Sequence, residues 1–104
     1  MKKILFIIVA LVALQSNISK SSAQSHEFAL IDAYGDQNRE LGEPKKGEKR
    51  VVFMGNSITW NWAWTRGDFF KNNGLIGRGI SGQTTYQFLL RFREYVIKLK
   101  PTVV

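Results

Sequence analysis

The residue type best suited to chemistry in this chain stands directly after a short apolar run. Residues 51–54 (VVFM) follow a basic stretch and end at the turn sequence Gly55-Asn56-Ser57. A continuous apolar run of this length predicts a strand buried on both faces of a parallel sheet. Catalytic groups of open α/β sheets gather where such strands end. Ser57 is therefore a candidate nucleophile, although a serine that begins a helix can also be only its N-cap.

A second candidate segment is residues 77–82, whose sequence GRGISG has the form G-x-G-x-x-G. In dinucleotide-binding proteins this pattern follows the first strand, and an acidic residue lies about 20 positions further on. Here it follows the second expected strand, and residues 100–103 (KPTV) include no acid. A nucleotide-binding oxidoreductase is therefore the weaker alternative.

Composition excludes several other kinds of site. The chain has no cysteine, so it can form neither a disulfide nor a thiolate zinc site. His26 is the single histidine, and it lies in a polar segment before the first expected strand, where a surface role is the simpler interpretation. We expect neither a metal nor an organic cofactor.

The elements that must position Ser57 alternate between strand and helix. After the strand at 50–55 we expect a helical connection over 58–73 closed by Gly74, and a strand over 75–80. Thr84 and Gln87 form a capping box that begins a helix over 85–99, and Pro101 ends it. A third strand begins at Thr102. This alternation predicts an α/β fold with a parallel sheet that is cut off in its third strand.

The helix at 85–99 has an apolar side and a polar side by its spacing. We expect the polar side to face solvent and the apolar side to pack in the core. The core positions are Phe88, Leu89, Phe92, Tyr95, Val96 and Leu99, and the solvent positions are Gln87, Arg91, Glu94 and Lys98.

The N-terminal residues have the features of an export signal. Lys2 and Lys3 precede an apolar run that ends at Leu14, and small residues at Ser21 and Ala23 fit cleavage after Ala23. An eleven-residue run is shorter than the roughly 20 residues that a membrane span needs. We therefore expect residues 1–23 to be a signal peptide, residues 24–49 an arm or linker, and the mature protein to be periplasmic or secreted without stable membrane insertion.

The net charge does not require a nucleic-acid partner. The chain has 15 basic and 8 acidic residues. Three of the lysines lie in the expected signal peptide, and without them 12 basic residues face 8 acidic ones, a net charge of +4. The densest basic cluster, residues 45–50, is interrupted by Glu48. We interpret it as a solvated linker leading into a strand, and we expect no nucleic-acid binding.

Two segments together resemble a known family. Residues 52–59 (VFMGNSIT) and 78–85 (RGISGQTT) are similar to the first and second blocks of the SGNH hydrolases, also called the GDSL esterase/lipase family. The resemblance covers residues 50–104 and implies a three-layer flavodoxin-like sandwich. It also implies that Ser57 is the nucleophile, and that the backbone N–H groups of Ser57 and Gly82 bind the oxyanion.

The resemblance has gaps. Asn56 stands where the family has aspartate, and the later G-x-N-D and D-x-x-H blocks, which supply an asparagine donor and the histidine base, are not found in residues 1–104. The resemblance implies an exported serine esterase acting on a small-molecule or carbohydrate ester, with a carbohydrate O-acetyl group preferred. We expect the chain alone to be inactive. The alternative from another class is a non-catalytic exported binding module or remnant with the same fold.

Overall fold

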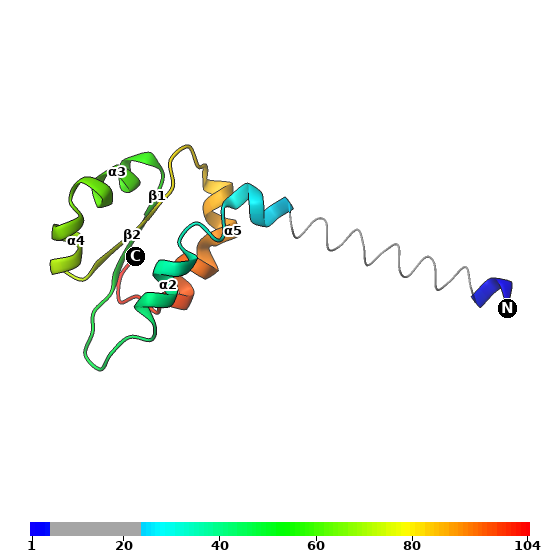
Figure 1. Cartoon of the computed structure of the whole chain (residues 1–104), viewed down its shortest axis with the longest axis horizontal. Coiled ribbons are helices and arrows are strands. Elements are labelled where there is room, and N and C mark those ends of the chain that lie inside the picture. The colour runs from blue at the N-terminus through cyan, green and yellow to red at the C-terminus, as the bar shows by residue number, and fades with distance from the viewer. Residues whose placement is uncertain (5–23) are drawn as a thin grey trace.

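The computed structural model describes residues 1–4 and 24–104 (Figure 1). Most of the apolar run of the predicted signal peptide, and the predicted cleavage site after Ala23, lie outside these residues. Within the described ranges, no helix has the length and apolar character needed to span a membrane.

The sheet is parallel, as the strand and helix order predicts. Strand β1 (Val51–Gly55) pairs with β2 (Leu75–Gly79), and the register aligns Gly55 with Gly79. On the other side of β1, Val103 forms a parallel bridge to Val51, and its carbonyl accepts a hydrogen bond from the Val52 N–H at 2.9 Å. The expected third strand is therefore present as a single bridge, and β1 lies in the middle.

One face of the sheet is covered by α3 (Ser57–Thr65) and α4 (Gly67–Asn72). The sequence predicted one helical connection here, and the structure has two helices joined at Arg66. The Phe53 ring contacts the rings of Trp62 and Phe70, with centroids 5.1 and 5.6 Å apart. Gly74 follows α4 with a φ of +65°, as expected of the glycine that ends a helix.

Glycines let α3 approach these strands closely. A Cβ at Gly79 would lie 2.8 Å from the Asn56 carbonyl oxygen, and a Cβ at Gly77 would overlap the Cβ of Ala63. The first two glycines of the G-x-G-x-x-G sequence are therefore explained by helix packing, without any phosphate.

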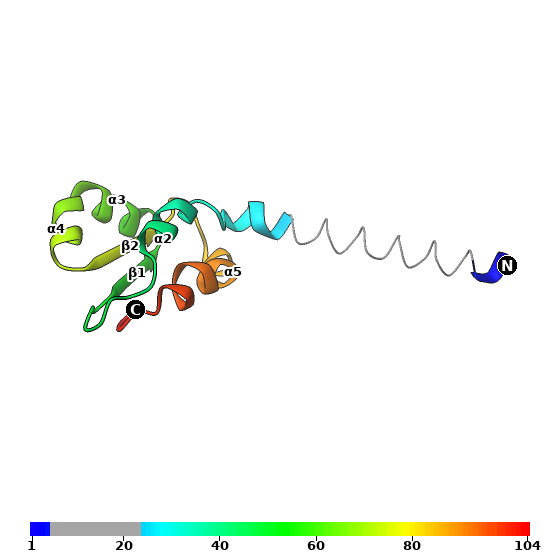
Figure 2. The same ribbon diagram turned by 60° about the horizontal axis from the view of Figure 1, so that its bottom comes forward.

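The opposite face carries the main apolar core. It is covered by α2 (Gly35–Leu41), α5 (Thr85–Tyr95) and the 3₁₀ turn η1 (Ile97–Leu99). Figures 1 and 2 show α3 and α4 on one side of the strands and α5 on the other, so the three-layer α/β prediction is confirmed. The core residues are Val52, Ile76, Val96 and Leu99, with Met54 and Leu41 packed against them.

The predicted helix over 85–99 is wrong in its length and in which of its side chains face the core. The capping box of Thr84 and Gln87 is present, but α5 ends at Tyr95 and a 3₁₀ turn follows. Side chains three residues apart eclipse in a 3₁₀ turn, and this brings Val96 and Leu99 into the core together. Leu89 is 76% exposed, whereas Arg91 is completely buried, because backbone carbonyls and a glutamine pair with its guanidinium.

The arm over 24–49 is helical at residues 24–29 and in α2, where one short helix was expected. It docks through polar contacts. The Gln83 and Gln87 side-chain amides donate to the carbonyls of Ala29 and Phe28 at 2.8 and 2.9 Å, and the Tyr95 hydroxyl donates to Leu30 at 2.7 Å. The arm is therefore fastened to α5 and to the turn before it.

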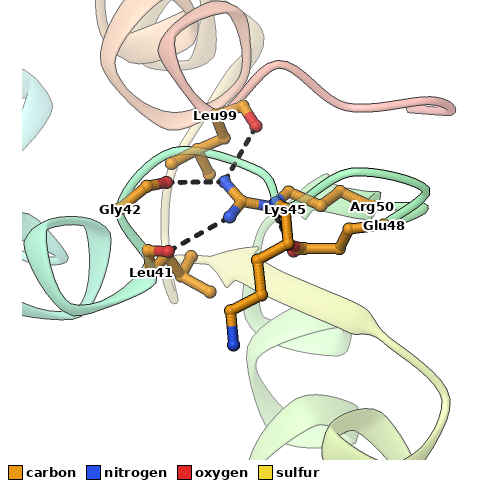
Figure 3. Close-up of polar contacts among 6 residues, drawn as sticks. All are labelled: Leu41, Gly42, Lys45, Glu48, Arg50 and Leu99. Carbon is orange, nitrogen blue, oxygen red and sulfur yellow. Dashed lines mark hydrogen bonds and ion pairs between the residues drawn. The ribbon is translucent and has the colours of Figure 1, made fainter.

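A buried arginine fastens the other end of β1 (Figure 3). Arg50 is 2% exposed, and its guanidinium donates to the carbonyls of Leu41, Gly42 and Leu99 at 3.0–3.1 Å and to the Glu48 carboxylate at 2.6 Å. These contacts join α2 and η1 to the start of the strand.

Candidate active site

Ser57 is the first residue of α3 and lies two positions beyond β1, exposed to solvent. The N-cap is Asn56, whose side-chain oxygen accepts a hydrogen bond from the Ile58 N–H at 3.4 Å. Asparagine therefore keeps the acceptor that the family's aspartate would supply. The interpretation of Ser57 as an N-cap is wrong, because Asn56 is the N-cap of α3.

The reactive groups of Ser57 are without partners in the described part of the chain. No described side chain or carbonyl forms a hydrogen bond with its hydroxyl. Its N–H lies in the first turn of α3, where backbone donors have no partner inside the helix. An exposed hydroxyl and a free N–H on one residue suit a nucleophile that also binds an oxyanion.

Gly82 lies in the turn between β2 and α5 and has a φ of +76°. A Cβ at this position would meet nothing within 4 Å, so the left-handed backbone is what favours glycine here. Across residues 24–104 the Gly82 N–H has no hydrogen-bond acceptor.

The sheet brings these two turns to one edge. Gly55 and Gly79 are in register at the carboxyl ends of neighbouring strands, and the Ile80 N–H donates to the Gly55 carbonyl at 3.1 Å. Ser57 and Gly82 follow those strand ends by two and three residues respectively. The structure thus places both predicted site residues where ligands of parallel sheets bind.

A residue that the sequence did not suggest lies beneath these turns. Arg91 on α5 donates to the carbonyls of Gly55 and Arg78 and to the Gln83 side chain. Burial lowers the pKa of Arg91 from its ordinary value. The sequence signal that could have found it is its spacing, since Phe88 and Tyr95 stand three residues before and four residues after it.

The general base is not found beside Ser57. His26, the single histidine, lies on the arm, where its Nδ1 is 3.3 Å from an Asp32 carboxylate oxygen. No hydrogen bond or ion pair joins it to Ser57 or Gly82 in the described residues. The described ranges also hold no cluster of three or more histidine, cysteine or acidic side chains that could bind a metal ion.

A groove of about 800 Å³ is lined by residues of β2, by side chains of α2, α3 and α4, and by Ser81, the neighbour of Gly82 in the chain. Trp60 and Trp64 of α3 line it, with their rings 6.1 Å apart and tilted by 11°. Arg78 also lines it, and burial lowers the pKa of Arg78 to about 10. Trp62 is 41% exposed, and its ring packs against Phe53 rather than lining the groove.

Comparison with known proteins finds several similar chains of solved structure, among them two from Bacteroides species. A protein assigned as an acylhydrolase from Bacteroides fragilis is 64% identical, with a TM-score of 0.69 over 72% of this chain and 36% of that one. A GDSL-like lipase from Bacteroides thetaiotaomicron is also 64% identical, with a TM-score of 0.69 over 73% of this chain and 38% of that one. No family model and no curated protein matches the chain.

The chain therefore spans a little more than a third of the length of the structures it matches. The identity extends over nearly three quarters of this chain, and the matched fold is the same parallel α/β arrangement. Together with the two sequence blocks at the ends of β1 and β2, these similarities show that the chain belongs to the SGNH, or GDSL-like, hydrolase family.

Proposed function

We propose that this chain supplies the nucleophile and two oxyanion donors of an exported serine esterase. The observation that carries the proposal is the meeting of an exposed Ser57 hydroxyl and two unpaired backbone N–H groups, those of Ser57 and Gly82, at the ends of neighbouring strands. Donors held in place by secondary structure need no reorganisation when charge develops on a carbonyl oxygen.

The proposed reaction has two steps. The Ser57 oxygen attacks the ester carbonyl carbon while a histidine from outside residues 1–104 takes its proton. The two N–H groups hold the oxyanion until the alcohol leaves with that proton. Water then attacks the acyl-enzyme, the same histidine accepts the proton from water, and Ser57 is released with a free carboxylic acid.

The proposed substrate is an O-acetylated carbohydrate. Trp60 and Trp64 support this choice, because indole faces stack on the apolar faces of sugar rings and both line the groove, which Ser81, the neighbour of Gly82, also lines. The N-terminal residues support an exported enzyme, which would meet extracellular polysaccharides.

The test uses a protein of the relatives' length that contains this chain, called the family-length protein below. A fluorophosphonate probe should give one adduct, on Ser57, by mass spectrometry. The Ser57→Ala variant should lose the adduct and lose turnover of a small acetyl ester by at least about 10³-fold. The matched control is Ser81→Ala, a substitution in the exposed turn beside Gly82. This variant should keep the adduct on Ser57.

The substrate is tested separately. Trp64→Ala should raise the KM for acetylated oligosaccharides several-fold and leave the KM for a small acetyl ester unchanged. An equal effect on both esters would contradict the carbohydrate proposal. A family-length protein that binds the acetylated sugar without any adduct on Ser57 would support the non-catalytic binding module.

A further inference from the structure

Arg91 is joined to both of the turns that carry the proposed site. Its terminal nitrogens donate to the Gly55 carbonyl at 3.0 Å and the Arg78 carbonyl at 2.7 Å, and its Nε donates to the Gln83 side-chain oxygen at 2.5 Å. Gly55 comes two residues before Ser57 in the chain, and Gln83 follows Gly82 directly. One side chain thus binds the backbone at the ends of both strands and the side chain of the residue that follows Gly82.

The guanidinium itself has little freedom. Arg91 is completely buried, and its charged centre lies 5.1 and 5.2 Å from the ring centroids of Phe88 and Tyr95. Gln83 is also buried, and its amide nitrogen donates to the Ala29 carbonyl at 2.8 Å, which fixes the orientation of the amide. The planar arrangement of arginine donors therefore sets the relative placement of its three acceptors.

Stability alone does not account for an arginine at this place. The hydrogen-bond partners of its side chain in the described residues are two carbonyls and one amide, with no carboxylate. Burying a charge costs free energy that hydrophobic residues of similar volume would not incur. What arginine adds is several donors in one plane, directed at the ends of two strands.

We propose that Arg91 is a positioning residue that sets the placement of the Ser57 and Gly82 N–H groups relative to each other. This inference rests on the proposed function. Loss of one oxyanion donor lowers kcat by about 10²–10³-fold in other hydrolases, and a misplacement of about 1 Å can cost about 10²-fold. A disturbed Arg91 should therefore lower kcat without weakening the binding of substrate.

The main experiment compares Arg91→Lys with Arg50→Lys in the family-length protein. Both arginines are buried and donate to backbone carbonyls, but Arg50 lies at the end of β1 away from Ser57. For a small acetyl ester, Arg91→Lys should lower kcat about 10- to 100-fold and leave KM near its original value. Fluorophosphonate labelling of Ser57 should slow in the same proportion. Arg50→Lys should be less stable, with its kcat and labelling rate unchanged.

A second pair of variants keeps the test valid if Arg91→Lys does not fold. Gln83→Leu removes one acceptor of Arg91 while its two carbonyl contacts stay, so kcat should fall less, by about 10-fold. Gln83→Glu keeps the acceptor for Arg91 but loses the N–H that donates to the Ala29 carbonyl, so its kcat should lie between those of Gln83→Leu and the unmodified protein.

A readout independent of activity separates this inference from the proposed function. In amide hydrogen exchange, residues 55–59 and 80–84 should exchange faster in Arg91→Lys than in Arg50→Lys. If the unmodified protein gives no adduct on Ser57, the proposed function fails, whatever the exchange shows. If folded Arg91→Lys keeps its original kcat and exchange, or if Arg50→Lys loses kcat equally, the positioning role is overturned.

Discussion

The two ends of β1 use the same side chain to different effect. At the beginning of the strand, the Arg50 guanidinium binds the carbonyls of Leu41, Gly42 and Leu99 (Figure 3), and its own carbonyl accepts hydrogen bonds from Thr102 and Val103. At the far end, Arg91 binds carbonyls in the same way. There, however, the N–H groups of Ser57 and Gly82, in the turns beyond the strands, find no acceptor within the described residues.

The difference teaches where this fold can do chemistry. Backbone polar groups that are removed from water are almost always paired. At the Arg50 end, called the closed end below, they pair with one another and with the Arg50 guanidinium; the Arg91 end is called the open end. At the Arg91 end the Gly55 and Arg78 carbonyls are paired, but the N–H groups of Ser57 and Gly82 are not, and these two donors stay available at the surface. A substitution at the closed end should therefore change stability, and one at the open end should also change chemistry.

The largest expected effect is at the open end, where helix α3 meets the strands. Gly79→Ala would place a Cβ 2.8 Å from the Asn56 carbonyl oxygen and force α3 to move. The free energy of unfolding should fall by about 3 kcal/mol, and kcat should fall with it because Ser57 begins that helix.

The matched control is Gly67→Ala. A Cβ at Gly67 meets nothing within 4 Å, and the residue begins α4. Its free energy of unfolding, from chemical denaturation, should stay the same or rise by about 0.5 kcal/mol. A Gly79→Ala protein as stable as Gly67→Ala would show that the helix does not pack as described.

At the closed end, Arg50→Met should lower the free energy of unfolding by about 2–3 kcal/mol, because it leaves three carbonyls without their donor. The rate of fluorophosphonate labelling at Ser57 should be unchanged at a temperature where the variant is folded. A labelling rate that falls along with stability would break the distinction between the two ends.

A smaller change in stability is expected for Gly82→Ala. Its φ of +76° disfavours any residue with a Cβ, at a cost of about 1–2 kcal/mol. Turnover should fall more than this loss suggests, because the backbone N–H proposed as an oxyanion donor would shift. Comparison of kcat with unfolding free energy for Gly82→Ala and Arg50→Met sharpens the contrast, and an unchanged kcat in Gly82→Ala would remove Gly82 from the proposed site.

The smallest effect concerns pH. The hydrogen bond from Arg50, followed by that from the Lys45 N–H, lowers the pKa of Glu48 below its ordinary value of 4.5. A lowered carboxyl pKa contributes stability that is present above pH 4.5 and is lost as pH falls through the folded-state value. Glu48→Gln should therefore flatten the dependence of the melting temperature on pH below about 4.5. If that dependence is unchanged in the variant, the hydrogen bond between Arg50 and Glu48 does not contribute as described.

Local pattern determined a large part of this protein. The apolar runs at 51–54 and 75–76 predicted β1 and β2, because a strand buried on both faces needs continuous apolar residues. The capping box predicted the start of α5, since its two residues interact across a single turn. The same local evidence placed Ser57 and Gly82 beyond the strand ends, where the structure has them.

Only the tertiary structure decided the roles of the arginines. Helical spacing put Arg91 on the solvent side, because pattern-based reasoning assumes that charged side chains stay in water. Its burial depends on the Gly55 carbonyl, which is 36 residues away in sequence, and on a Gln83 side chain that is itself held by the arm. The acceptors of Arg91 come together only when the strands, the helix and the arm are assembled. The residues next to Arg91 in the chain therefore cannot reveal them, and the proposed positioning role of Arg91 could be recognised only in the folded molecule.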